Sequence, residues 1–120
     1  MNRIVKEPGP DHPIVIEPHR GTVAISAGGR EIARTEAALV LREAGYPPVF
    51  YVPRADARME LLRKVERETW CPYKGAAAYF DIVGGDTIPA AVWSYETPHA
   101  GVAAIGGHLA FYPDKVRIEA

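Results

Sequence analysis

The chain has 120 residues, of which 14 are Lys or Arg and 15 are Asp or Glu, and its formal net charge is −1. This length fits one domain, and the sequence has no basic cluster of the kind that sequence-independent nucleic-acid binding needs to neutralise phosphates. No stretch approaches the ~20 apolar residues of a membrane span, and the first residues lack a secretory apolar core. We therefore expect a cytoplasmic protein that binds neither nucleic acid nor membranes.

Residues 1–13 are predicted to form an extended lead-in, because each proline in the segment 8–13 restricts the backbone of the residue before it. The folded part is expected to span residues 14–120 as a single, mainly β domain. Its 11 glycines and 11 prolines support this class, since they divide the sequence into short apolar runs separated by turns.

The first predicted strands lie on either side of a glycine pair. Ile14–Ile16 is a short β-rich run, and Thr22–Ser26 alternates between apolar and small or polar residues. Gly28-Gly29 then leads into Arg30–Arg34. Two residues that accept positive φ between such runs predict a tight β-hairpin.

The segment Glu36–Ala44 is ambiguous. Its apolar residues Ala37, Val40, Leu41 and Ala44 have helical spacing, which favours a short helix. Its length is compatible with a strand as well, so this pattern alone does not choose between the two structures.

The middle of the chain predicts short elements separated by charge. Val49–Val52 is rich in β-formers and is expected to be a strand that Pro53 ends. Arg54–Ala57 is predicted to form one helical turn. The charged stretch Arg63–Glu68 is expected to be a solvated sheet edge or a loop.

The last third predicts a second hairpin, in which Gly84-Gly85-Asp86 connects strands at Ala76–Val83 and Ile88–Tyr95. Ala100–Ile105 is small and apolar and suits a short helical turn. A final short strand is expected at Val116–Ile118. Strand should therefore exceed helix throughout, with antiparallel pairing.

A candidate reactive group lies in the segment 70–75, where Cys71, Tyr73 and Lys74 share a stretch bent by proline and followed by glycine. A lysine near a thiol favours the thiolate, which makes the thiol a better nucleophile, and a partly desolvated lysine can itself form imines. The alternative is structural. Cys71 would then be a small buried hydrophobe and Lys74 would extend to water.

His108 is the second candidate, because the preceding Gly106-Gly107 leaves the backbone beside it open to a ligand. A histidine there could act as a general base near neutral pH, or it could be a hydrogen-bonded strand residue with no further role. We predict that Cys71, Lys74 and His108 converge as a catalytic group. The aromatic residues Tyr73, Tyr79, Trp93 and Tyr95 are the predicted ligand-binding residues, although aromatic residues at β spacing often serve only as core.

No metal ion or cofactor is expected. The single cysteine cannot form a multi-cysteine zinc site, and the four histidines show no paired spacing. Nor do the aspartates form the close pair that two-metal phosphoryl transfer requires.

Five blocks of this sequence resemble the bacterial domain-of-unknown-function family number 427. They are Tyr51–Asp56, Met59–Leu62, Cys71–Gly75, Trp93–Tyr95 and Gly107–Val116. The resemblance spans about residues 14–118. Its most specific parts are the Cys-Pro-Tyr-Lys-Gly block and the Gly-His-Leu-Ala-Phe-Tyr block, in this order and separation.

The resemblance implies a compact fold of coiled antiparallel sheets, similar to the β-tent group that includes zinc-bearing methionine sulfoxide reductases and guanine-nucleotide-exchange chaperones. It also implies that Glu36–Glu43 is a strand, against the helical spacing of its apolar residues. The zinc cysteines of those relatives are absent here, so their metal is not carried over. The family also has a nucleotidyltransferase label, but the Gly-Ser loop and close Asp pair expected for that activity are absent.

From these observations we expect a domain that binds a small molecule, such as an anionic or nucleotide-like metabolite, on a concave face bearing Cys71, Lys74 and His108. The sequence leaves open whether catalysis follows binding, and it does not specify the oligomeric state. The alternative function is a protein-interaction module that packs its aromatic face against a partner.

Overall fold

The protein is built almost entirely from short antiparallel strands. A computed structural model describes residues 3–120. Its strands are β1 (Ile14–Pro18), β2 (Val23–Ala27), β3 (Arg30–Thr35), β4 (Leu39–Glu43), β5 (Val49–Tyr51), β6 (Leu62–Cys71), β7 (Gly75–Ile82), β8 (Ile88–Ser94), β9 (Ala110–Phe111) and β10 (Arg117–Glu119). In the described part, helix is limited to the 3-10 turns η1 (Arg54–Asp56), η2 (Met59–Leu61) and η3 (Ala100–Ile105). The predicted mainly β class is confirmed.

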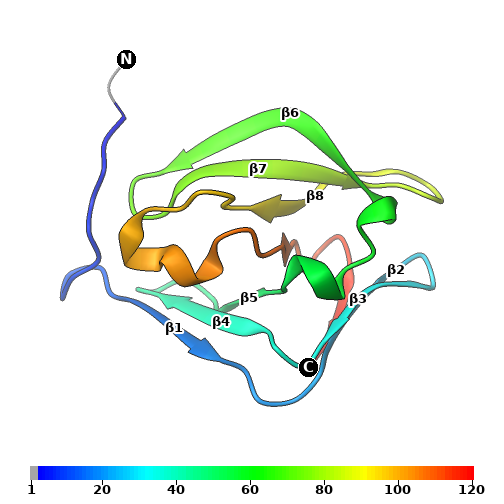
Figure 1. Cartoon of the computed structure of the whole chain (residues 1–120), viewed down its shortest axis with the longest axis horizontal. Coiled ribbons are helices and arrows are strands. Elements are labelled where there is room, and N and C mark those ends of the chain that lie inside the picture. The colour runs from blue at the N-terminus through cyan, green and yellow to red at the C-terminus, as the bar shows by residue number, and fades with distance from the viewer. Residues whose placement is uncertain (1–2) are drawn as a thin grey trace.

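The strands form three antiparallel sheets with the orders β1-β4-β5, β10-β2-β3 and β6-β7-β8-β9. In Figure 1 the β6-β7-β8 strands form one layer and β1, β4 and β5 form another, with η3 across the side between them. The β2–β3 hairpin extends at the opposite end of the molecule from the N-terminal segment. No helix in residues 3–120 is long and apolar enough to cross a membrane.

Both glycine hairpins predicted from the sequence are confirmed. Gly28 and Gly29 connect β2 to β3 with φ of +59° and +77°, the left-handed values that a two-residue turn requires and that glycine adopts without strain. The second hairpin joins β7 to β8 through residues 83–87. The predicted turns at Arg54 and Ala100 are also confirmed, as η1 and η3.

The charged stretch Arg63–Glu68 lies within β6, which is an edge strand of its sheet. This confirms the solvated-edge alternative over the loop. Charged side chains are a common feature of edge strands, because they discourage pairing with another chain.

The ambiguous segment is a strand, as the family resemblance implies. β4 lies between β1 and β5, with Leu41 opposite Ile16 in one and Val49 in the other. Val40 and Leu41, whose side chains project to opposite faces of the strand, are both buried. A strand buried on both faces shows no alternation, which explains why its pattern resembles a helix.

The core divides into two clusters of buried side chains. The first is mostly aliphatic and includes Val23, Ile25, Ile32, Val52, Phe80, Val92, Leu109 and Phe111. The second contains three tyrosines and includes Leu41, Tyr51, Ala77, Tyr79, Tyr95, Val102 and Ile105. The second cluster supports the candidate site described below.

The lead-in packs against the domain. The Lys6 amide donates a hydrogen bond of 2.9 Å to the Pro72 carbonyl, and the Trp70 indole N–H donates one of 2.9 Å to the Ile4 carbonyl. A turn closed by the pairing of Gly9 with His12 then leads into β1. In Figure 1 this segment runs along one end of the layers, and it brings His12 to the candidate site.

Candidate functional site

An aromatic wall is created by the β7–β8 hairpin. Its register places Tyr79 directly opposite Trp93, and Tyr95 follows two positions after Trp93, which puts it on the same side. Tyr112, just beyond β9, packs on Trp93 with ring centroids 4.5 Å apart. Tyr51 of β5 completes the wall and is almost fully buried.

This wall borders a cleft made of two adjoining cavities. The larger has a volume of about 780 Å³ and the narrower about 220 Å³. They share the lining residues Glu43, Tyr46, Pro47, Val49, Lys74, Trp93 and Tyr112. The larger cavity adds Cys71 and mostly apolar side chains, and the narrower adds Tyr51, Tyr79 and Tyr95. We call these two cavities together the aromatic cleft.

Three polar side chains meet at one part of the cleft. Lys74 donates a hydrogen bond from Nζ to Oε1 of Glu43, and Oε2 of Glu43 is 2.7 Å from Nε2 of His12. Lys74 and Glu43 are each only 9% exposed. Because a carboxylate only accepts, the Nε2 atom of His12 is the donor.

Local sequence explains how these three groups meet. Glu43 ends β4. Lys74 lies in the turn between β6 and β7, where its amide donates to the Cys71 carbonyl at 3.2 Å and Gly75 follows with a φ of +107°. His12 is held by stacking on Tyr73, with ring centroids 3.9 Å apart.

The electrostatics keep Glu43 ionised. Burial by itself would raise the pKa of this carboxyl, but the hydrogen bonds from Lys74 and His12 outweigh burial and hold the pKa below its ordinary value. The ammonium of Lys74 also lies 5.8 Å from the centre of the Tyr95 ring, within range of a cation–π interaction. The cleft therefore contains a compensated ion pair rather than a free charge.

Three tyrosines of the cleft, Tyr51, Tyr95 and Tyr112, stay neutral near physiological pH. Burial raises the pKa of Tyr51 and of Tyr95 well above the usual range for a phenol. Burial, together with a side-chain hydrogen bond that the neutral Tyr112 phenol donates to Tyr79, raises the pKa of Tyr112 to about 12. These phenols can therefore donate and accept hydrogen bonds without adding charge.

The structure brings several of the predicted residues together. Cys71, Lys74 and Trp93 line the larger cavity, and Tyr79 and Tyr95 line the narrower one together with Lys74 and Trp93. Tyr73 lies next to the cleft, where it supports His12, and it lines a separate cavity of about 610 Å³ beneath the lead-in.

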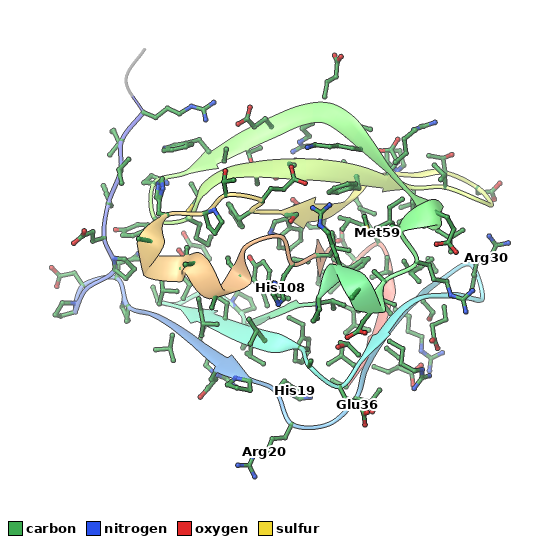
Figure 2. All side chains as sticks on the ribbon, in the orientation of Figure 1. His19, Arg20, Arg30, Glu36, Met59 and His108 are labelled. Carbon is green, nitrogen blue, oxygen red and sulfur yellow. The ribbon has the colours of Figure 1, made fainter. Side chains whose placement is uncertain are left out.

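His108 lies elsewhere. It is not among the described residues that line either part of the cleft, and its Nδ1 is 3.1 Å from the Gly106 carbonyl. Its own carbonyl accepts a hydrogen bond of 2.7 Å from Ser94, next to Arg54, which bonds to Glu96 and to the Gly107 carbonyl. Figure 2 shows His108 just after η3, in the middle of the view. The structure does not bring it to Cys71 and Lys74.

Sequence reasoning missed Glu43 and His12. In the sequence Glu43 follows Arg42 and resembles an ordinary surface charge, and His12 lies in a segment predicted to be outside the folded domain. One pattern could have found Glu43, since it lies two positions after Leu41 and so on the same face of the strand. The contribution of Tyr51 and Tyr112 depends on tertiary packing that no local pattern encodes.

Within residues 3–120, no three His, Cys, Asp or Glu side chains gather closely enough to hold a metal ion. The polar groups of the cleft are an amine, a carboxylate, a thiol and several phenols, and the His12 imidazole contacts the carboxylate. These groups can form hydrogen bonds, transfer protons and react with electrophiles.

Comparison with known proteins gives a family. No curated protein matches the chain. The family model described as a domain of unknown function, DUF427, matches residues 15–120, which include every strand except the first residue of β1. The chain is therefore a member of the DUF427 family.

Proposed function

We propose that this protein binds a small, planar and largely apolar organic molecule in the aromatic cleft, with a polar group of the ligand directed at the Lys74–Glu43 pair. The observation that carries the proposal is the convergence of aromatic side chains and a buried ion pair on one cleft of about 780 Å³. Cavities of this size and mixed character are typical of small-molecule sites.

The charge of the cleft favours some ligands over others. Lys74 is neutralised by Glu43, so an anionic or nucleotide-like ligand finds no free cation among the described lining residues. The ring system of a nucleoside can pack on the aromatic wall. A phosphate group is less suited to the Lys74–Glu43 pair, because the charge of Lys74 is already compensated. A neutral or weakly polar aromatic compound is the occupant that the lining supports best.

The alternative of a protein-interaction module has less support. The aromatic residues that would form a docking face line a cleft instead, and Tyr51 and Tyr95 are buried. Among residues 3–120, the exposed large hydrophobic side chains are Ile4, Val5, Val15 and Tyr46. Three of these four belong to the lead-in or β1, away from the aromatic wall.

The cytoplasm is the proposed setting. The single cysteine allows no internal disulfide, as is usual for proteins of a reducing compartment.

The two tryptophans of the chain allow a direct test. Trp70 bonds to the lead-in and is outside the cleft lining, so a Trp70→Phe protein reports on Trp93 alone. We expect adenosine, which has negligible emission of its own, to change this emission in a saturable manner, and adenosine, indole or 2-naphthol to raise the melting temperature. The matched control is Trp93→Phe, whose remaining Trp70 should not respond.

A variant that fills the cleft locates the binding. Val49 lines both cavities, so Val49→Phe is expected to abolish the response without removing a polar group or adding a second tryptophan to the cleft. If none of the planar compounds alters Trp93 emission or the melting temperature, the proposed function is wrong. Binding that survives in Val49→Phe would move the site away from the cleft.

A further inference from the structure

We propose that Lys74 is a reactive amine that forms an imine with an aldehyde or ketone bound in the aromatic cleft, with Glu43 as its acid–base partner. This inference rests on the proposed function and narrows it, because it names carbonyl compounds as the class of ligand. It also gives the buried ion pair a chemical role.

The first support is geometric. Lys74 lines both cavities of the cleft, and the hydrogen-bond partner of its Nζ atom is a carboxylate rather than a backbone group. A carboxylate in direct contact with an amine can take a proton from it and later donate that proton to a hydroxyl group formed on the attached carbon. Imine formation needs both transfers.

The second support is the connection of Glu43 to solvent. Its other oxygen is 2.7 Å from Nε2 of His12, whose side chain is 22% exposed, whereas the Glu43 side chain is only 11% exposed. His12 is a positioning residue in this scheme. It holds the carboxylate toward Lys74 and links a buried acid–base group to water.

The steps balance as follows. Glu43 accepts a proton from the Lys74 ammonium, and the free amine attacks the carbonyl carbon, so that a C–N bond forms as the C=O π electrons move to oxygen. A proton passes from nitrogen to that oxygen to give a carbinolamine. Protonated Glu43 then gives its proton to the hydroxyl group, the C–O bond breaks, and water leaves. The products are a protonated imine, one water molecule and the regenerated carboxylate.

The regenerated carboxylate stabilises the product. The protonated imine keeps the positive charge at Nζ, next to Glu43 and near the ring of Tyr95. The same groups that hold the ammonium in the free protein therefore hold the cation of the adduct. This match stabilises the adduct on Lys74 relative to an imine on a surface lysine, because water can hydrolyse an exposed imine freely.

The other lysines provide internal controls. Lys64 pairs with Glu96 and its side chain is 57% exposed, and Lys115 donates to the Pro89 carbonyl at an exposed position. Lys6 is exposed in the lead-in. None of these three lines the aromatic cleft.

The test is reductive trapping of the intact protein. We would incubate it near neutral pH with 2-naphthaldehyde and sodium cyanoborohydride, which reduces an imine to a stable secondary amine, and then map modified lysines by mass spectrometry. Lys74 should be modified on the order of tenfold faster than any other lysine, because the cleft holds the aldehyde beside it. An excess of 2-naphthalenemethanol, which cannot form an imine, should protect Lys74 alone.

Variants assign the roles. Lys74→Arg keeps the positive charge and should lose the adduct, and Glu43→Gln should slow trapping on the order of tenfold or more. His12→Phe keeps a ring on Tyr73 but not the bond to Glu43, so trapping should slow, whereas His12→Gln, which keeps a donor for Glu43, should retain more of the parent rate. Equal trapping rates in His12→Phe and His12→Gln would show that His12 is only structural.

Failure of this inference is distinguishable from failure of the proposed function. If 2-naphthaldehyde changes Trp93 emission but Lys74 is trapped no faster than Lys64 or Lys115, the cleft binds the aldehyde and the imine proposal is wrong. If the aldehyde and the planar alcohols all leave Trp93 emission unchanged and Lys74 is not preferred, both proposals are wrong. The protection experiment uses the parent protein, so it stands even if a variant fails to fold.

Discussion

The rings of His12 and Tyr73 lie parallel, with centroids 3.9 Å apart and an interplanar angle of 4°. One ring belongs to the lead-in and the other to the turn between β6 and β7 that also carries Lys74. The stack therefore joins two parts of the chain that the sequence separates by 61 positions, and it fixes the imidazole that bonds to Glu43.

Two substitutions separate the stack from the hydrogen bond. His12→Phe keeps the aromatic contact and removes the bond to Glu43, which should reduce the free energy of unfolding by about 1.5–3 kcal/mol, as expected for a bond to a charged group. His12→Ala removes both interactions and should cost about 0.5–1.5 kcal/mol more. Urea denaturation measures both values. Equal stability of the two variants would show that the stack contributes nothing.

Glu43 should make stability depend on pH. Its folded-state pKa lies below the ordinary value of 4.5, so its contribution is present above that pH and is lost as the pH falls through the folded-state value. Glu43→Gln should therefore be less stable than the parent at pH 7, and the difference should shrink below pH 4.5.

The pH test needs a comparison because two other carboxyl groups also have lowered pKa values. Hydrogen bonds from the Ala90 amide and Arg63 lower the pKa of Asp81. Hydrogen bonds from Lys64 and Arg54 lower the pKa of Glu96. The parent will thus lose stability in acid for several reasons at once. The free energy of unfolding of the parent and of Glu43→Gln should be measured by denaturation over about five pH units, from about pH 3 to about pH 8. The difference between the two proteins isolates the contribution of Glu43. A difference independent of pH would contradict the assignment.

Gly75 should tolerate no side chain. Its φ of +107° is strained for any residue with a Cβ, although an added Cβ would be 3.5 Å from the His99 ring, which is an ordinary van der Waals contact. Gly75→Ala should reduce the free energy of unfolding by about 1–3 kcal/mol, the usual range for a strained backbone position. Because Gly75 directly follows Lys74, the variant should also weaken selective trapping of that lysine.

A matched control for this substitution is Gly85→Ala. Gly85 lies in the β7–β8 turn, its φ is not in the positive range, and an added Cβ would have nothing within 4 Å. Thermal melts of the two variants should therefore differ clearly, with Gly85→Ala close to the parent. Equal melting temperatures would show that the conformation at Gly75 is not strained for alanine.

His108 should be dispensable for binding in the cleft. Its ring bonds to the Gly106 carbonyl and lies outside the cleft lining, so His108→Gln is expected to leave the Trp93 response to adenosine unchanged. Lys74→Met, by contrast, removes a lining group and should weaken that response. Loss of the response in a folded His108→Gln protein would restore His108 to the site.

Much of the fold could be predicted because its turns are encoded locally. Gly28 and Gly29 take the positive φ that their pairing in the sequence suggests, and the short apolar run at Ala100–Ile105 does form a helical turn. β4 is different. Val40 and Leu41 are both buried, so the two-residue period that identifies a strand is absent, and only resemblance to a family indicated the strand.

The candidate site could be predicted only in part, for a related reason. Lys74 lies in a short segment that also carries a thiol and a phenol, and Trp93 lies in a segment with a clear strand pattern. Both residues line the cleft. Glu43 meets Lys74 across 31 positions, and nothing near either residue encodes that approach. The glycines before His108 likewise suggested that it would join the site. His108 lies between η3 and β9, and its place in the fold depends on how those elements pack, which no local pattern encodes.

The pairing of β10 with β2 affects how the protein is made. Ser26 lies opposite Arg117, so the ribosome synthesises β2 about 90 residues before its partner. At roughly 5–20 residues per second, β2 spends several seconds or more with one bare edge in the nascent chain. During that interval Val23 and Ile25, later buried in the core, lie beside an unpaired strand edge, an arrangement that makes a nascent chain prone to aggregation.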